Sequence, residues 1–224
     1  MSLPGGGPAS LAGRRLYLCT PDRPDLESFL DACLAGGVDL VQLRDKHLDA
    51  RPLLVRARQA LRVCRHHGVP FILNDRPDLA LEAGADGVHV GQDDAPPALA
   101  RRLLGGDRIV GLSTHAPAEL DASLGEPVDY VSAGPVVATP TKPGRPGTGD
   151  DYVTYASARA GRPVYVTGGV TPERVPALVA AGARHFVVVR YLVDSPDPGT
   201  AAAELRLAVD RALEAQAQPA DEAG

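Results

Sequence analysis

Charged and amide side chains directly follow an apolar run near the start of the chain. Gln42, Arg44 and Lys46 lie at or just after the end of the run 40–43. Because side chains alternate along a strand, Gln42 and Arg44 are expected on the same face. Two cations beside the end of a strand suit a polyanion such as diphosphate. Taken alone, the motif also fits the ordinary interpretation of charges on a solvated loop.

Two acidic residues follow later apolar runs in the same way. Asp75 comes after Asn74 and the run 71–73, and Asp94 comes shortly after the run 87–90. Each carboxylate could simply cap the helix expected next in the chain. If the two runs form adjacent parallel strands, however, the carboxylates are within reach of one hard cation. Mg²⁺ is typically bound by one or two carboxylates together with phosphate oxygens and water.

A phosphate-binding pattern lies near the C-terminal end. Gly168 and Gly169 follow an apolar run, Thr171 and Pro172 predict a capped helix start, and Arg190 follows the next apolar run. A glycine pair, a helix N-terminus and a donor after the following strand are typical of the monophosphate site of many barrel enzymes. The pattern therefore indicates a phosphate but not a reaction.

Ser113 and two histidines are further candidates. Ser113 follows the run 109–112 and could donate a hydrogen bond into a site, although stabilising a turn is an equal alternative. The six histidines show no metalloprotease spacing. His89 lies within an apolar run and is interpreted as a packed residue, whereas His115 is a candidate supporting residue beside Ser113. The sequence contains no nucleophile elbow, which argues against a catalytic triad.

The elements that position these residues are eight short apolar runs alternating with helical patterns. Eight such units in 224 residues average about 28 residues each, the size of one strand–helix repeat of a (β/α)₈ TIM barrel. An open doubly wound sheet is the alternative, but its usual Gly-rich turn is missing after the first run. We expect a single barrel domain over residues 14–216, with flexible segments at 1–13 and 217–224. The runs are Leu16–Cys19, Leu40–Leu43, Phe71–Leu73, Gly87–Val90, Ile109–Leu112, Tyr130–Ser132, Val164–Val166 and Phe186–Val189.

One connection is much longer than the others. Residues 134–150 contain four Gly and four Pro, and a loop of this length is either functional or disordered. It follows the sixth run, so it is expected over the carboxyl-end opening of the barrel, where such enzymes act. We predict that it closes over bound substrates.

Composition narrows the class of protein. With 44% hydrophobic residues the chain can build a core, and a net charge of −5 argues against a nucleic-acid surface. No apolar run approaches the length of a membrane span, and no leader opens the chain. Three cysteines without CxxC spacing indicate buried thiols of a reducing cytosol. We expect a cytoplasmic protein that acts on small molecules, and a homo-oligomer stays open.

Six sequence blocks, in order, resemble the thiamine phosphate synthase family from Leu16 to about Ala212. The resemblance implies a (β/α)₈ barrel that uses Mg²⁺ to join a pyrimidine methyl diphosphate to a thiazole phosphate or its carboxylated form, releasing diphosphate. One departure is Val189-Arg190, where many members have Ile-Ser. The blocks are Gln42–Lys46 (QLRDK), Asn74-Asp75, Ala85–Asp94 (ADGVHVGQDD), Gly111–Ser113 (GLS), Gly134–Lys142 (GPVVATPTK) and Gly168–Val170.

The resemblance also implies roles for individual residues, with Mg²⁺ bound by Asp75 and Asp94. Residues implied to contact the pyrimidine diphosphate are Gln42, Arg44, Asp45, Lys46, Asn74, Ser113 and Lys142. Residues implied to contact the thiazole phosphate are Thr139, Pro140, Thr141, Gly169, Val189 and Arg190. Residues implied to act in catalysis are Arg44, Ser113 and Lys142.

The implied reaction is a dissociative displacement, which needs stabilisation of the departing anion and close positioning but no nucleophilic side chain. Arg44, Lys46 and Lys142 carry three positive charges, and Asp75 and Asp94 carry two negative ones, so the side chains present a net charge of about +1 to a diphosphate of roughly −3. One bound Mg²⁺ would raise the net charge of the site to about +3.

Two alternative functions stay open. A thiazole tautomerase would share the barrel and the phosphate site but needs no diphosphate site. A sensor or scaffold subunit would leave the metal and diphosphate residues unexplained.

Overall fold

The computed structural model describes residues 10–138 and 147–217. Most of the two predicted terminal segments, 1–13 and 217–224, and the centre of the predicted 134–150 loop lie outside the described residues. Within the described part of the chain, no helix is both long and apolar enough to cross a membrane.

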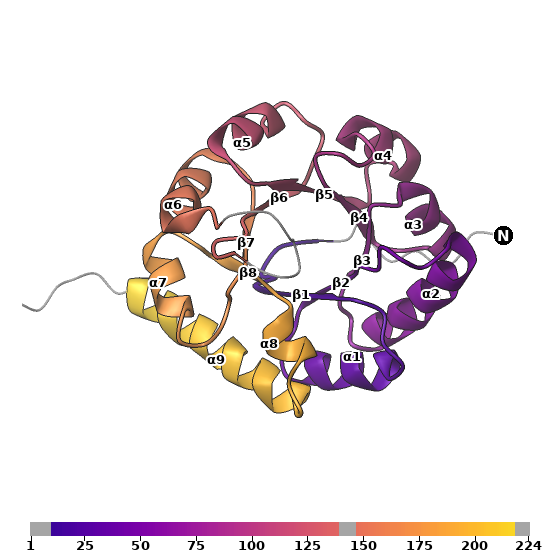
Figure 1. Cartoon of the computed structure of the whole chain (residues 1–224), viewed down its shortest axis with the longest axis horizontal. Coiled ribbons are helices and arrows are strands. Elements are labelled where there is room, and N and C mark those ends of the chain that lie inside the picture. The colour runs from indigo at the N-terminus through magenta and orange to yellow at the C-terminus, as the bar shows by residue number, and fades with distance from the viewer. Residues whose placement is uncertain (1–9, 139–146, 218–224) are drawn as a thin grey trace, which may run out of the picture.

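Eight parallel strands close into a barrel in chain order, with β8 pairing back to β1 (Figure 1). This arrangement confirms the predicted (β/α)₈ barrel and rejects the open sheet. All eight predicted runs form strands, although β8 ends one residue earlier than predicted. The strands are β1 Leu16–Thr20, β2 Leu40–Leu43, β3 Phe71–Asn74, β4 Gly87–Val90, β5 Ile109–Thr114, β6 Tyr130–Ala133, β7 Val164–Thr167 and β8 His185–Val188.

Helices form a ring outside the strands (Figure 1). In α2, for example, the buried side chains recur every three or four residues, which places one apolar stripe against the barrel. The last helix, α9, packs on α1 and α7 and so covers the junction between the first and last strands. The helices are α1 Leu26–Ala35, α2 Ala50–His66, α3 Pro77–Ala83, α4 Pro97–Leu104, α5 Pro117–Ser123, α6 Gly149–Arg159, α7 Val175–Ala180, α8 Arg190–Val193 and α9 Pro198–Ala217.

Two predicted boundaries near the C-terminal end are wrong. The helix expected to begin at Pro172 begins at Val175. The carbonyl of Thr171 accepts the backbone N–H groups of both Arg174 and Val175, so the intervening residues form a turn and not the first turn of the helix. Likewise, the run predicted to end at Val189 ends at Val188, and the one-turn helix α8 begins at Arg190.

The interior of the barrel is built around aromatic rings. Tyr17, Tyr130 and Tyr165 are fully buried there, and their rings contact one another edge to face. Gly111 on β5 makes this possible, because a Cβ atom at that position would overlap the ring of Tyr130. The three cysteines are buried and form no disulfide, and one of them, Cys19, lies in this interior cluster.

Three aspartates join the strands at the amino end of the barrel. Asp39, Asp86 and Asp129 each stand immediately before an even-numbered strand. Their carboxylates accept a backbone N–H at the start of the preceding odd-numbered strand: from Leu16 at 2.8 Å and Phe71 at 2.8 Å, the first residues of β1 and β3, and from Val110 at 2.7 Å, the second residue of β5. In each pair the aspartate N–H donates in return to the carbonyl of the same residue. The position before β8 is Arg184.

Candidate active site

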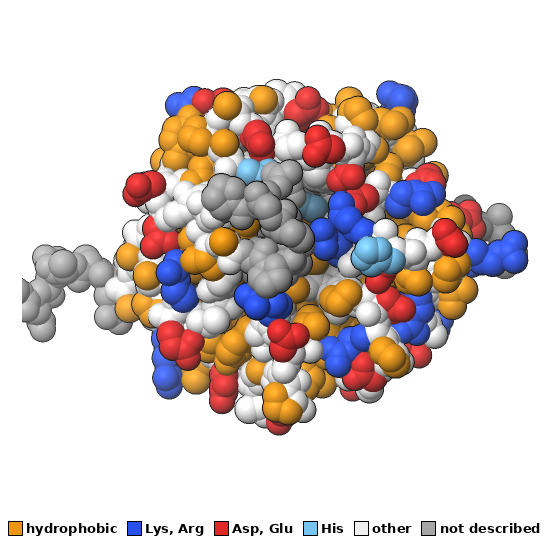
Figure 2. Space-filling model, viewed as in Figure 1, with side chains coloured by type: hydrophobic (Ala, Val, Ile, Leu, Met, Phe, Trp, Pro, Cys, Tyr) orange, Lys and Arg blue, Asp and Glu red, His pale blue; other side chains and the backbone are white. Residues whose placement is uncertain are grey.

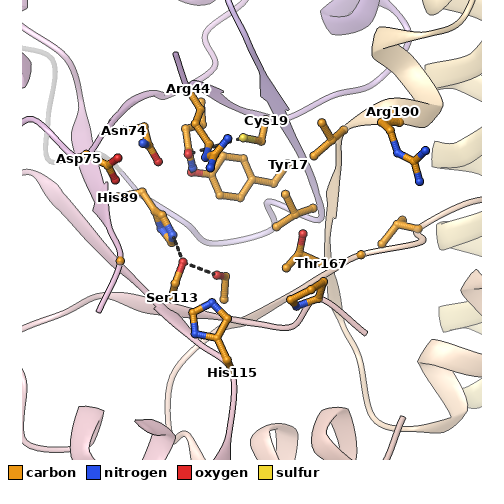
Figure 3. Close-up of a pocket in the computed structure, with 18 of the residues that line it drawn as sticks. Tyr17, Cys19, Arg44, Asn74, Asp75, His89, Ser113, His115, Thr167 and Arg190 are labelled. Atoms are coloured by element: carbon orange, nitrogen blue, oxygen red, sulfur yellow. Dashed lines mark hydrogen bonds between the residues drawn. The ribbon is translucent and has the colours of Figure 1, made fainter. Parts of the chain in front are cut away.

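A pocket of about 400 Å³ opens at the carboxyl ends of the strands (Figure 3), within the size range of small-molecule sites. Lys and Arg side chains gather beside the centre of the face seen in Figure 2. The lining includes most of the predicted site residues: Gln42, Arg44, Lys46, Asn74, Asp75, Asp94, Ser113, Gly169, Val189 and Arg190.

The other predicted site residues lie elsewhere. Asp45 is not part of the pocket lining. One of its carboxylate oxygens accepts the backbone N–H groups of His47 and Leu48, at 2.8 and 2.9 Å, so the side chain shapes the loop after β2. Thr139, Pro140, Thr141 and Lys142 fall outside the described residues.

The two acidic residues meet at the rim of the pocket. The carboxyl groups of Asp75 and Asp94 are hydrogen-bonded to each other, and Lys46 Nζ lies 3.1 Å from Asp75 Oδ2. Neither aspartate caps the helix that follows it, because the N-cap positions are Arg76 and Pro96. The geometry therefore favours a shared carboxylate site over two helix caps.

The two carboxyl groups differ in acidity. Burial and the neighbouring Asp94 raise the pKa of Asp75, and Lys46 offsets this only in part. Burial also disfavours ionisation of Asp94, but hydrogen bonds from Asp75 and from the Gly91 N–H at 2.8 Å hold its pKa below the usual value. Ionisation of one carboxyl group therefore disfavours ionisation of the other.

The backbone of Asp75 is unusual as well. Its φ of 61° puts it in the left-handed region, the only such residue other than glycine within 10–138 and 147–217. The conformation costs on the order of 1 kcal/mol for a residue other than glycine. It is held by the Asp75 N–H, which donates to the His89 carbonyl of the neighbouring strand at 2.8 Å. Strain of this kind is concentrated at functional sites.

Buried polar side chains form the floor of the pocket. We call the hydrogen-bonded series Gln42, Tyr17, Tyr130, His89 and Ser113 the floor chain. Its links run from Gln42 Nε2 to Tyr17 Oη at 2.5 Å, then to Tyr130 Oη at 2.8 Å, His89 Nδ1 at 2.9 Å, and from His89 Nε2 to Ser113 Oγ at 2.9 Å. His89 and Ser113 face each other in Figure 3.

Sequence reasoning missed most of the floor chain. His89 is buried, as predicted, but it also bonds Ser113 at the pocket. Tyr17 and Tyr130 belong to apolar runs and carry no site motif of their own. The signal available was strand alternation: Tyr17 precedes Cys19 by two residues and Tyr130 precedes Ser132 by two, and both later residues line the pocket.

His115 also lines the pocket, beside Ser113 (Figure 3). Its Nδ1 lies 2.8 Å from Glu119 Oε2, and the same oxygen accepts the His115 backbone N–H at 2.8 Å. The first turn of α5 therefore fixes this side chain, which suits the supporting role predicted for it.

The far side of the pocket has the features of the predicted phosphate site. Gly168 and Gly169 have φ values of 95° and 73°, and a Cβ on Gly168 would crowd Pro135 and Val136. Only glycine fits this turn without rearrangement. Arg190 lies across the pocket from Asp75 (Figure 3), and its side chain forms no ion pair with the described part of the chain.

A closed (β/α)₈ barrel with a polar, charged pocket at the carboxyl ends of its strands belongs to the class of TIM-barrel enzymes. The family model for thiamine monophosphate synthase matches residues 16–192. The chain is 48% identical over 201 residues to thiamine-phosphate synthase of Acidothermus cellulolyticus, covering 88% of this chain and 95% of the relative. It is 51% identical over 198 residues to thiamine-phosphate synthase of Thermus thermophilus, covering 86% and 95%.

Among solved structures, thiamine phosphate pyrophosphorylase from Pyrococcus furiosus superposes with a TM-score of 0.81 at 27% identity, covering 89% of this chain and 97% of that one. The chain therefore belongs to the thiamine-phosphate synthase family. It is an enzyme of thiamine biosynthesis, a transferase with thiamine-phosphate synthase activity. This result sets aside the tautomerase and the sensor or scaffold alternatives.

Proposed function

We propose that the pocket binds the pyrimidine methyl diphosphate and the thiazole phosphate together, and that diphosphate departs before the thiazole attacks. The C–O bond of the pyrimidine methylene breaks and leaves its electron pair on the diphosphate oxygen. A C–N bond to the thiazole nitrogen then forms. The observation that carries the proposal is the contact between Asp75 and Asp94, with Lys46 beside them, at the rim of the pocket.

The residues at this rim fit Mg²⁺. Two neighbouring hard carboxylates, each of which disfavours the ionisation of the other, suit a hard divalent cation. In the part of the chain that the structure describes, no group of three or more His, Cys, Asp or Glu could hold a metal. Asp75 and Asp94 would therefore bind Mg²⁺ together with substrate oxygens and water. When bound, the ion supplies charge stabilisation for the leaving diphosphate.

Side chains around the acidic pair supply the rest of the diphosphate site. Arg44 and Lys46 reach the pocket from the loop after β2, and the nearly buried Asn74 and Ser113 face the same space. Cations and neutral donors stabilise the charge that builds on the leaving oxygens. Lys142, outside the described residues, is proposed to add a third cation, and Gln42 to orient the pyrimidine.

The thiazole phosphate is proposed to bind on the opposite side, at Gly169, Val189 and Arg190. Positive-φ glycines let the backbone approach a ligand closely, and the Arg190 guanidinium supplies charge and paired donors for phosphate oxygens. Thr139, Pro140 and Thr141 are proposed to complete this site from the loop after β6.

The setting of the reaction is also proposed. Three buried cysteines that form no disulfide are consistent with a reducing compartment, so we infer that the enzyme works in the cytoplasm. Its partners are then the two small-molecule substrates.

Replacing either rim carboxylate tests the proposal. We expect Asp75→Ala and Asp94→Ala each to lower the rate of thiamine phosphate formation by at least about a hundredfold at fixed Mg²⁺, because the departing anion loses its counter-ion. Asp78→Asn is the matched control: it removes a nearby carboxylate that pairs with Arg76 on the surface, and surface pairs contribute little.

Chelation provides a second readout. Excess chelator should abolish thiamine phosphate formation by the wild-type enzyme, and added Mg²⁺ should restore it. Full activity in chelator would contradict the proposed role of the acidic pair, as would equal losses in Asp94→Ala and Asp78→Asn.

A further inference from the structure

The floor chain has a direction, because each hydroxyl in it has only one hydrogen to donate. The direction is set at Gln42. Its Nε2 donates to Tyr17 Oη, while its Oε1 accepts from Cys19 Sγ at 3.6 Å. The Tyr17 hydroxyl and the Cys19 thiol can each donate or accept, so the direction is the one that the Gln42 amide has in the structure. With the amide so placed, Tyr17 receives a hydrogen and passes its own onward.

The remaining links follow from that first one. Tyr17 donates to Tyr130, and Tyr130 donates to Nδ1 of His89. Burial raises the pKa of both tyrosines far above 10, so each keeps its hydrogen and stays a donor. His89 Nδ1 is then an acceptor, and the imidazole proton lies on Nε2, which donates to Ser113 Oγ.

Ser113 is the last residue of the floor chain. Its oxygen accepts from His89 Nε2 and also, at 3.4 Å, from Ser132 Oγ. Both of these neighbours give a hydrogen to Ser113, so neither takes the hydrogen of its hydroxyl. Ser113 is buried beneath the pocket that it lines. The open direction for its O–H is therefore toward a ligand.

We propose that the floor chain holds His89 as the Nε2–H tautomer and thereby fixes Ser113 as a hydrogen-bond donor to the departing diphosphate oxygen, which makes His89 a positioning residue. The identity of the acceptor rests on the proposed function. The tautomer and the direction of the chain do not, since they follow from the protein alone.

The direction matters for the reaction. A donor strengthens its interaction as negative charge accumulates on the leaving oxygen, so it stabilises the transition state more than the ground state. With the amide of Gln42 turned over, every link would reverse and Ser113 would present a lone pair to that oxygen. The chain thus decides whether Ser113 promotes or opposes departure.

The first test measures the tautomer in the free enzyme by ¹⁵N NMR of the histidine side chains. We expect the neutral ring of His89 to carry its proton on Nε2. Tyr130→Phe removes the donor to Nδ1 and should give a mixture of tautomers. Tyr165→Phe is the matched control, because its hydroxyl bonds the Arg14 carbonyl outside the chain; it should retain the wild-type spectrum.

A proton on Nδ1 in the wild-type enzyme, or a tautomer unchanged by Tyr130→Phe, would overturn the proposed direction. This readout needs no substrate, so it stands even if diphosphate departure proves not to be the mechanism. If only the proposed function fails, His89 will carry its proton on Nε2 as expected, but Asp75→Ala and Asp94→Ala will remain active.

The second test compares two replacements of His89. A glutamine amide reaches the position of Nε2 and can still donate to Ser113, whereas an asparagine amide reaches only the position of Nδ1. We expect His89→Asn to lower kcat by about ten- to a hundredfold with little change in KM for the thiazole phosphate, and His89→Gln to restore most of the loss.

Calorimetric titration with Mg²⁺ and inorganic diphosphate gives an activity-independent measure for the same pair of variants. We expect the affinity for diphosphate to be weaker in His89→Asn than in His89→Gln. Equal kcat values and equal diphosphate affinities in the two variants would show that the Nε2 donor has no such role, and would overturn the proposal.

Discussion

At the scale of single residues, the pocket combines an acidic rim with a floor of polar side chains that lie within the strands. Asp75 and Asp94 follow the ends of apolar runs, where a charged residue stands out in the sequence. Tyr17, His89 and Tyr130 lie within strands and look like ordinary core residues. Their chemistry arises only where register places His89 beside Asn74 and the space above Gly111 admits the Tyr130 ring.

Arg190 is the residue at which this chain departs from the family pattern, and it carries a prediction at the same scale. We expect Arg190→Ser to raise KM for the thiazole phosphate about tenfold, because a charge-assisted hydrogen bond contributes about 1.5–3 kcal/mol. The kcat should change little. Steady-state kinetics at two salt concentrations measures this, since the arginine enzyme should be the more salt-sensitive.

The control for Arg190 is Arg102→Ser, an exposed arginine on α4 whose loss changes the net charge equally. Its kinetic constants should match those of the wild-type enzyme. If Arg190→Ser instead raises KM for the pyrimidine diphosphate, the residue belongs to the other substrate.

At the scale of elements, strand order follows from the alternation of apolar runs and helices, but the contacts that align the strands do not. Asp39, Asp86 and Asp129 recur at equivalent positions before β2, β4 and β6. Their role depends on carboxylates reaching across to a neighbouring strand. The pattern of apolar runs does not reveal these hydrogen bonds. The start of α7 is equally hidden, because Thr171-Pro172 looks like the capped start of a helix but forms a turn before it.

Asp86 provides the test of these strand-joining carboxylates. Asp86→Ala leaves the buried Phe71 N–H without its carboxylate acceptor, and we expect a loss of about 1–3 kcal/mol in the free energy of unfolding. Asp86→Asn keeps an acceptor oxygen and should lose less. Urea unfolding of both variants and of the wild-type enzyme measures the differences. Equal free energies of unfolding for Asp86→Ala and wild type would show that the hydrogen bond to the carboxylate contributes nothing.

At the scale of the whole molecule, the amino end of the barrel makes stability depend on pH through His185. The ring lies against Tyr165, with centroids 5.0 Å apart. Burial, with Arg15 nearby, lowers the pKa of His185 to about 4 from 6.5. Between pH 4 and pH 6.5, His185 therefore binds a proton more tightly in the unfolded chain than in the folded one. The stability contribution is therefore complete above pH 6.5 and is lost as pH falls toward 4, by up to about 3 kcal/mol.

Replacing the imidazole isolates this contribution from the carboxyl groups that titrate in the same range. His185→Gln does not titrate, so its stability relative to wild type should rise by up to about 3 kcal/mol between pH 7 and pH 4. His66→Gln, at an exposed position, is the matched control substitution. Urea unfolding at half-unit pH steps gives both curves. Parallel curves for His185→Gln and wild type would mean that the buried ring accepts its proton as readily as the unfolded chain does, and that the acid sensitivity of the barrel originates elsewhere.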